Sequence, residues 1–420
     1  MFYFTSGKEV AAVENRIIFL IDMQSFYANL EKLAHPLLTD KPVVVAGDPS
    51  IRSGVILAAC PTAKSYGIQT AEPIWQAQNK CPHVHILKPH MQFYVNVSVT
   101  ISSFLEQYSA AVEPYSIDEV FLELPAMEQG KAEQLAQHIK QRLLREIGVQ
   151  ARIGIGTTKV YAKMACDHFA KESRTGTAVL NDANAAELLW PLPIGRLFSV
   201  GNRMETHLLN MGIRTIGQLA RHPLYDLKKR WGINGELLWQ TARGYDTSPV
   251  SPSTHQKRKS IGHHMTLPRD YYHWSEIKVV LRELSEEVSR RSRQHTSLGQ
   301  VVSIGAVGQE YGFKRSFHRQ QRLFEPTNSG RVIFETASAL FKEYWDGTPI
   351  RSLGISLSSL QPAHYKQLSL FDTDEDLDSL YHTIDQLKDK YGMDAVLHAS
   401  SLSPAGQAMI RAKKIGGHYK

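Results

Sequence analysis

Short apolar runs alternate with stretches of helical periodicity through the first 185 residues of the chain. The runs RIIFLIDM, KPVVVAGD and SGVILAAC predict buried strands, and the spacing of apolar positions predicts helices at 91–110 and 131–147. AAVEPYS and EVFLEL predict the arms of a hairpin, followed by a strand at ARIGIG, a helix at 158–171 and a last strand at GTAVL. Strands mixed with helices and a hairpin indicate an α+β fold rather than a wound parallel sheet.

The pattern changes to short, Gly-interrupted helices over residues 186–245. In FSVGNRMETHLLNMGIRTIGQLA, a tight loop at Gly201 precedes a helix that Gly212 caps at its C-terminal end. This arrangement is typical of a helix-hairpin-helix, whose N–H groups point at phosphates. A plain helical hairpin fits the spacing equally well.

A Ser/Pro-rich and then basic stretch at 246–258 predicts an interdomain linker. Residues 259–360 then follow the order strand, helix, strand, strand, helix, strand, which is that of a ferredoxin-like domain. Beyond Leu360 the chain is polar and then acidic, with one weak helical pattern at 376–391. We therefore expect residues 361–420 to form a mostly flexible tail.

Composition places the chain among multidomain globular proteins of a reducing compartment. It has 420 residues, of which 42% are hydrophobic and 21% charged. No apolar run approaches the roughly 20 residues that span a bilayer, and the N-terminal residues lack the pattern of a signal peptide. Cys60, Cys81 and Cys166 have no paired spacing, so we expect free thiols and a cytoplasmic location.

Positive charge is concentrated in one segment. The net charge is +7, and residues 251–360 hold 16 Lys and Arg against 10 Asp and Glu, with 11 Arg among the cations. Arginine suits bidentate phosphate contacts, so this segment predicts a polyanionic partner, nucleic acid first. A merely solvated basic surface is the alternative.

Acidic residues stand at the ends of two predicted strands. Asp22 ends the first strand, Asp118 stands at the turn of the hairpin, and Glu119 begins its second arm. Carboxylates gathered at a sheet edge suit Mg²⁺, and two such ions about 4 Å apart can hold the attacking and leaving oxygens of a phosphoryl transfer. Neighbouring strand residues face opposite ways, so Asp118 and Glu119 converge only if the backbone turns between them. A solvated turn is the alternative.

Three motifs in this order carry a family resemblance. IDMQSFYANLE, YSIDEVFLE and GIGTTKVYAKMACDHFAK together resemble the Y-family DNA polymerases, the DNA polymerase IV and V group that copies damaged templates, over residues 15–360. The resemblance implies a DNA-directed DNA polymerase that performs low-fidelity translesion synthesis. It implies a palm with a mixed or antiparallel sheet, a fingers insertion, a small helical thumb and a little finger. The corresponding ranges are 1–32 with 91–185, 33–90, 186–245 and 259–360.

The resemblance also implies roles for individual residues. The catalytic carboxylates that hold two Mg²⁺ ions correspond to Asp22, Asp118 and Glu119, and the backbone carbonyl of Met23 corresponds to a further metal ligand. Phe26 and Tyr27 correspond to nucleotide contacts, Tyr27 being the steric gate that leaves no space for a 2′-hydroxyl. Lys64 and Lys171 correspond to the cations on the triphosphate.

The chain departs from the family pattern in the fingers. Ala58 and Pro61 stand where family members often carry Thr and Tyr, so two phosphate-binding hydroxyls are missing. Val55 and Ala71 correspond to packing positions around the nascent base pair. These departures motivate a second hypothesis, a catalytically weak factor that binds DNA and the sliding clamp at primer ends. A two-metal nuclease is a third hypothesis, which does not explain Tyr27.

Partners follow from the same resemblance: primer–template DNA, dNTPs and the sliding clamp (β subunit), with no membrane and a monomeric chain. Candidate DNA contacts are Gly201, Lys259, Arg315 and Arg319. In HYKQLSLFDTDEDLD, four residues resemble the pentapeptide with which bacterial proteins dock on the clamp: Gln367, Leu368, Leu370 and Phe371. A tail that folds back on its own domain is the alternative.

Overall fold

Two units make up the chain in the computed structural model. One comprises residues 1–41 and 93–255, and the other comprises residues 42–92 and 256–420. The structure describes residues 16–48, 54–254, 258–310, 313–363 and 375–419.

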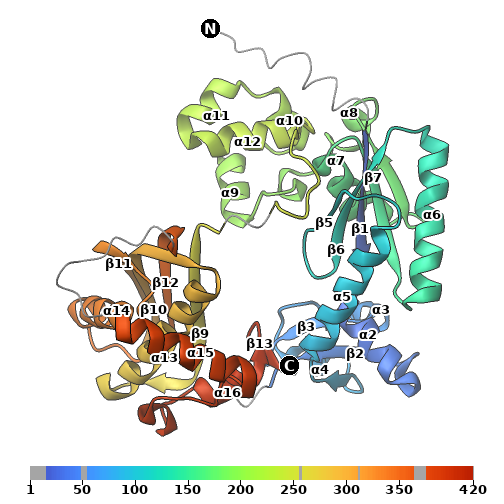
Figure 1. The fold of residues 1–420 in the computed structure, drawn as a ribbon. Helices are drawn as coiled ribbons and strands as arrows, with labels where there is room; N and C mark the ends of the chain where they lie inside the picture. Colours follow the sequence, from blue (N-terminus) through green and yellow to red (C-terminus); the bar gives the residue numbers. More distant parts are fainter. Residues whose placement is uncertain (1–15, 49–53, 255–257, 311–312, 364–374, 420) are drawn as a thin grey trace. The chain divides into compact units, whose positions relative to one another are not determined.

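The first unit is built on a five-stranded sheet with the strand order β5-β6-β1-β7-β8 (Figure 1). All neighbouring strands are antiparallel except β7 and β8. The strands are β1 (Arg16–Met23), β5 (Val112–Pro114), β6 (Glu119–Pro125), β7 (Ala151–Gly156) and β8 (Thr177–Leu180). The predicted hairpin is confirmed, because β5 and β6 pair directly.

Helices cover both faces of this sheet. The predicted helices form as α5 (Met91–Leu105) and α6 (Gln129–Glu146), and α6 buries an apolar stripe that includes Ala136 and Ile139. α7 (Lys159–Met164) continues directly into a π-helix, Ala165–Ala170. Two residues of the π-helix and α7, Ala162 and Cys166, share a buried cluster with Ile18 and Leu20 of β1.

Gly154 of β7 allows α7 to approach the sheet closely. A Cβ at this position would overlap the carbonyl oxygen of Ala162 and the backbone nitrogen of Cys166. The motif GIGTTK therefore brings the helix backbone against the sheet at the strand that neighbours Asp22. Lys159 and Lys163, discussed below, are side chains of this closely packed helix.

Four short helices follow the sheet. They are α9 (Asn202–Asn210), α10 (Ile216–Arg221), α11 (Leu224–Trp231) and α12 (Ile233–Ala242), and they share a core that includes Leu208, Leu219 and Leu238. Gly201 is the N-cap of α9, and Gly212 follows the same helix with φ +80°. The predicted glycine boundaries of this helix are thus confirmed.

The stretch after α12 is packed along the sheet rather than free. Val250 is buried with the apolar cluster under α7. Glu113 accepts hydrogen bonds from the backbone N–H of Ser251 at 2.9 Å and from the Thr254 hydroxyl at 3.0 Å. The first half of the predicted linker is therefore part of this unit.

The second unit contains three sheets, one of which only pairs β13 (Lys414–Ile415) with β14 (His418–Tyr419). The three-stranded sheet has the order β3-β2-β4, with β2 (Val43–Ala46), β3 (Ile56–Ala59) and β4 (His85–Leu87), together with α3 (Pro61–Ser65) and α4 (Ile74–Lys80). The four-stranded sheet, called the larger sheet below, has the order β11-β10-β12-β9. Its elements appear in the predicted order: β9 (Ser260–Tyr271), α13 (Trp274–Gln294), β10 (Ser297–Glu310), β11 (Phe313–Thr327), α14 (Gly330–Tyr344) and β12 (Ile350–Pro362).

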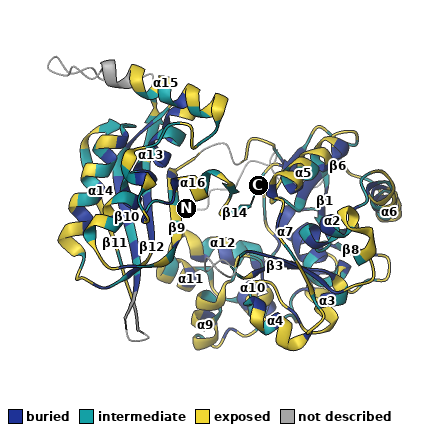
Figure 2. Cartoon of the chain, turned by 90° about the horizontal axis from the view of Figure 1, so that it is seen from below, coloured by how far each residue is buried: buried dark blue, intermediate teal, exposed yellow. Residues whose placement is uncertain are grey.

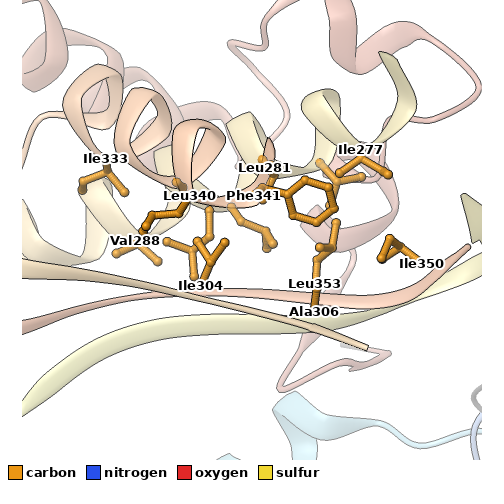
Figure 3. Close-up of a cluster of buried hydrophobic side chains, with 14 of the residues drawn as sticks. Ile277, Leu281, Val288, Ile304, Ala306, Ile333, Leu340, Phe341, Ile350 and Leu353 are labelled. Atoms are coloured by element: carbon orange, nitrogen blue, oxygen red, sulfur yellow. The ribbon is translucent and has the colours of Figure 1, made fainter. Parts of the chain in front are cut away.

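Helices α13 and α14 pack on one face of the larger sheet. Side chains from both helices, such as Leu281 and Phe341, meet Ile304 and Leu353 of the central strands (Figure 3). The central strands β10 and β12 are largely buried, whereas α14 shows an exposed outer surface (Figure 2). Burial does not alternate at the centre of β12, where residues 352–355 are all buried.

The prediction of a flexible tail is wrong for residues 375–419. These residues include α15 (Glu375–Tyr391) and α16 (Ala408–Ala412), which are held against α13. Asp385 accepts two hydrogen bonds from the buried Arg293 guanidinium, at 2.7 and 2.9 Å, and the Gln407 backbone N–H donates to Glu283 at 3.0 Å. Buried ion pairs between distant segments leave no local periodicity, so the polar sequence gave no signal of this packing.

Candidate active site

Asp22 and Glu119 lie opposite each other on neighbouring strands. They form a register pair of β1 and β6, so their side chains leave the same face of the sheet. The turn before Glu119 is closed by two hydrogen bonds to the Glu119 carbonyl oxygen, from the N–H groups of Tyr115 at 2.9 Å and Ser116 at 3.1 Å. The backbone thus turns at the acidic pair.

Asp118 sits in that turn. Its carboxylate accepts a hydrogen bond from the Ser116 hydroxyl at 2.7 Å, and its backbone carbonyl accepts one from the N–H of Met23 at 2.9 Å. The Asp118 charge contributes to raising the pKa of Asp22, so the two carboxylates act on each other. Met23 itself is buried.

A further carboxylate joins this group from the π-helix. Ligand oxygens of Asp22, Glu119 and Asp167 lie within 4.8 Å of one another. The structure thus brings two of the three predicted metal ligands together with a residue that was not predicted. Asp167 stands in the quoted motif YAKMACDHFAK, four residues from a lysine on each side, and this spacing is the signal that could have identified it.

Two lysines from the same helical segment neutralise part of the acidic charge. Lys171 lies 3.4 Å from Asp22 and 3.1 Å from Asp167, and Lys163 lies 2.5 Å from Glu119. Lys163 is also a residue that was not predicted. Burial alone would lower its pKa, but the hydrogen bond to Glu119 and the Asp167 charge raise it above the usual value.

The electrostatics of the group favour an added cation. Burial raises the pKa of the Asp22 carboxyl to about 6; Lys171 opposes this shift, and Glu119 and Asp118 add to it. A carboxylate that is hard to ionise in the metal-free protein becomes a ligand when a divalent ion supplies the missing positive charge. All donors in the group are hard oxygens, which suits Mg²⁺. The residues present therefore fit a divalent metal.

Tyr27 occupies the first turn of α2 (Phe26–Ala34), directly after the Asp22 strand. Its ring stacks on the ring of Tyr94, with centroids 4.5 Å apart and planes at 17°. Tyr94 is fully buried, and its hydroxyl donates a 2.5 Å hydrogen bond to buried Glu31. Phe26 is buried beside Tyr27, with ring centroids 5.9 Å apart. The Tyr27 ring thus has a rigid support that sequence reasoning missed.

Comparison with known proteins identifies the family. The profile of the impB/mucB/samB family matches residues 21–167, that of the family's C-terminal domain matches 258–370, and that of the DNA polymerase-iota thumb domain matches 195–246. DNA polymerase IV 2 of Bacillus subtilis (strain 168) is 50% identical over 97% of this chain and 100% of its own length. This chain belongs to the impB/mucB/samB family, the Y-family DNA polymerases.

Other relatives agree with this assignment. The polymerase is 47% identical to DNA polymerase IV 2 of Halalkalibacterium halodurans over 97% of this chain and 100% of that protein. A solved Y-family DNA polymerase chimera of Dbh and Dpo4 shares the fold, with a TM-score of 0.69 at 20% identity over 82% of this chain and 99% of the chimera. The chain is therefore a DNA-directed DNA polymerase of the translesion type, which acts on primer–template DNA and dNTPs and uses a divalent metal.

The predicted phosphate contact in the fingers lies in the second unit. Lys64 is exposed on α3 of the polymerase. The two residues that depart from the family pattern have structural roles in this unit. Ala58 is largely buried in β3. Pro61 occupies the first turn of α3, where a backbone N–H would have no partner within the helix, so that its absence costs nothing. Ala71 has φ +70°, and Val55 is 39% exposed.

The predicted DNA contacts lie in different settings. Gly201 and Lys259 are exposed, each just before a regular element. Arg319 pairs in register with core residue Ile304, which places it on the helix-covered side of β11, where its guanidinium lies 4.3 Å from the Tyr344 ring centroid. Arg315 lies on the same side and contacts Asp346 at 2.8 Å. Both arginines thus contact residues at the C-terminal end of α14 or just after it.

The predicted clamp-docking residues Gln367, Leu368, Leu370 and Phe371 lie outside the described residues. Among the helices that the structure describes, none is both long and apolar enough to cross a membrane.

Proposed function

We propose that this polymerase performs nucleotidyl transfer at the sheet edge formed by Asp22 and Glu119. The 3′-hydroxyl of a primer attacks the α-phosphate of a dNTP, and pyrophosphate leaves. The observation that carries the proposal is the convergence of carboxylate oxygens of Asp22, Glu119 and Asp167 within 4.8 Å at the ends of two paired strands. Lys163 and Lys171 balance only part of the charge of these three carboxylates, which favours an added divalent cation.

Asp22, Asp118 and Glu119 would hold two Mg²⁺ ions, with the backbone carbonyl of Met23 as a further ligand. The ions supply positive charge that stabilises the attacking and leaving oxygens. The chain contributes the geometry: the register of β1 with β6 holds two carboxylates side by side, and the closed turn holds Asp118 next to them. The all-oxygen donor set favours Mg²⁺ as the bound ion.

Phe26, Tyr27, Lys64 and Lys171 are the proposed nucleotide contacts. Tyr27 faces the sugar as the steric gate, beside Phe26, and its stack on Tyr94 limits how far the ring can retreat from a 2′-hydroxyl. Lys171 and Lys64 would neutralise the triphosphate. Both are ammonium point charges, which attract phosphate without bidentate geometry.

DNA contacts would come from several surfaces. Gly201 presents a helix N-terminus, and Lys259 a cation at the start of β9; Arg315 and Arg319 stay candidates at the rim of the larger sheet. The sheet face opposite α13 and α14 is a further candidate, because small polar side chains alternate with the core positions there and admit close approach of a sugar–phosphate backbone. The accessible ones are Ser260, Thr266, Ser356 and Ser358, whereas Ser303 and Ser352 on the same face are buried.

Primer extension on an undamaged template with Mg²⁺ and dNTPs tests the metal site. We expect Asp118→Ala to abolish extension, whereas Glu128→Ala, which removes an exposed carboxylate at the start of α6, should extend like the wild type. Extension that survives Asp118→Ala would show that the site is misplaced. A wild type that binds DNA without extending it would favour the hypothesis of a catalytically weak binding factor.

Clamp docking through Gln367–Phe371 has a separate test. Deleting these residues should abolish stimulation of synthesis by the sliding clamp and spare basal synthesis by the monomeric polymerase. Stimulation that persists in the deletion variant would place the docking site elsewhere. Sedimentation of the chain alone should show a monomer.

A further inference from the structure

A chain of ion pairs runs across the carboxylates of the active site. Lys163 lies 2.5 Å from Glu119 and 3.2 Å from Asp167. Lys171 lies 3.1 Å from the other oxygen of Asp167 and 3.4 Å from Asp22. Asp167 is thus shared by both lysines, and each lysine also contacts one of the carboxylates assigned to metal.

The local sequence and the packing produce this arrangement. Lys163, Asp167 and Lys171 follow one another at intervals of four residues, so they lie on one side of α7 and the π-helix. The close approach that Gly154 allows brings that side to the edge of the sheet. Only 11% of the Lys163 side chain and 14% of the Glu119 side chain are exposed, so solvent screens this pair weakly.

The two ammonium groups occupy positions at which they compete with a metal ion. Glu119 and Asp22 can each coordinate a divalent cation only if the lysine nitrogen beside it moves away or shares the carboxylate, because like charges at such distances repel. A partly buried ammonium that loses its partner carries a desolvation penalty. Asp167 reduces that penalty, because its carboxylate already contacts both lysines. It can remain the ion-pair partner of each lysine when Glu119 or Asp22 binds metal instead.

We propose that Lys163 and Lys171 are internal counter-ions of the metal site, and that Asp167 is the positioning residue that receives them when Glu119 and Asp22 bind metal. The inference rests on the metal site assigned under Proposed function. It couples metal binding to the release of Lys171 from Asp22, which frees this lysine for the triphosphate. Asp167 then acts through the two lysines and not as a ligand of the metal.

Mn²⁺ titration followed by electron paramagnetic resonance tests this role, with the full chain on primer–template DNA. Lys163→Met should raise Mn²⁺ affinity about tenfold, because the competing cation is gone. Asp167→Asn should lower it about tenfold in the wild-type background but threefold or less in the Lys163→Met background. Lys131→Met and Glu128→Gln remove one exposed charge of each sign on α6 and should leave the affinity unchanged.

Thermal unfolding, first with EDTA and then with added Mn²⁺, tests the counter-ion role without measuring activity. Lys163→Met should lower the melting temperature of the metal-free protein, because it leaves Glu119, Asp22 and Asp167 with one cation fewer, and Mn²⁺ should then restore a larger part of the stability than in the wild type. A metal-free protein that becomes more stable on this substitution would overturn the counter-ion role.

The outcomes separate the two proposals. Equal losses of Mn²⁺ affinity on Asp167→Asn in both backgrounds would make Asp167 a direct metal ligand and overturn the inference alone. Mn²⁺ affinity that Glu119→Gln leaves unchanged would contradict the metal site itself, and the inference with it. Affinity that depends on Glu119, with a loss on Asp167→Asn that requires Lys163, is the result that we expect.

Discussion

Glu113 provides the sharpest stability prediction in the unit that carries the active site. This carboxylate is 2% exposed and lies on β5, at the base of the hairpin whose turn holds Asp118. One of its oxygens accepts from the ammonium group of Lys159 at 2.6 Å, and also from the N–H of Ser251 and the hydroxyl of Thr254. A single buried charge therefore joins the hairpin, α7 and the segment after α12.

The magnitude follows from the burial of both partners. Removing one member of a buried ion pair typically costs about 3 to 5 kcal/mol, because the other charge stays buried without compensation. We expect this loss in the free energy of unfolding for Glu113→Ala. Lys159→Met should cost less, about 2 kcal/mol, because the carboxylate keeps its two other donors and hydrogen bonds to a charged group are worth about 1.5 to 3 kcal/mol.

Urea denaturation measures these losses in the free energy of unfolding, for the single variants and for the combined Glu113→Leu, Lys159→Met variant. The combined variant should lose clearly less than the sum of the single losses, since neither charge is then left unpaired. Limited proteolysis should cut Glu113→Ala faster than the wild type near 251–254. Additive losses, or a Glu113→Ala variant as stable as the exposed-site control Glu128→Ala, would refute the reasoning.

Three other substitutions or conditions probe the site. Tyr27→Ala should raise ribonucleotide incorporation by at least tenfold in single-nucleotide extension, and unchanged discrimination would remove Tyr27 as the gate. Burial raises the pKa of the Asp22 carboxyl to about 6, so a metal ion must displace the Asp22 proton below that pH. Mn²⁺ affinity should therefore be constant above pH 7 and fall up to tenfold per pH unit below pH 6. An affinity that does not change with pH would contradict the raised pKa. In the metal-free protein, the same raised pKa means that this group's contribution to folding stability declines as pH rises from about 4 to 6, which urea denaturation can check. Gly154→Ala should destabilise the unit by about 1 to 3 kcal/mol and reduce extension, because α7 must move off the sheet.

Local sequence determined several features of this polymerase directly. The apolar runs around Asp22 and Glu119 are strands, the hairpin forms where EPYSIDEVF turns, and residues 259–360 adopt the predicted order of strands and helices. These features depend on the alternation and spacing of neighbouring residues, which a linear pattern records. The three motifs by themselves also indicate the family.

Contacts between distant segments were decided only by the tertiary structure. Asp167 and Lys163 lie beside the carboxylates of Asp22 and Glu119 because Gly154 of β7 allows the helical segment to pack closely on the sheet. Tyr94, 67 positions further along the sequence, stacks on Tyr27. Within residues 375–419, Asp385 and Gln407 hydrogen-bond to α13, and Ala405 packs into the core of the larger sheet. A hydrogen bond or ion pair between remote residues depends on where the backbone carries them, and local periodicity contains no information about that distance.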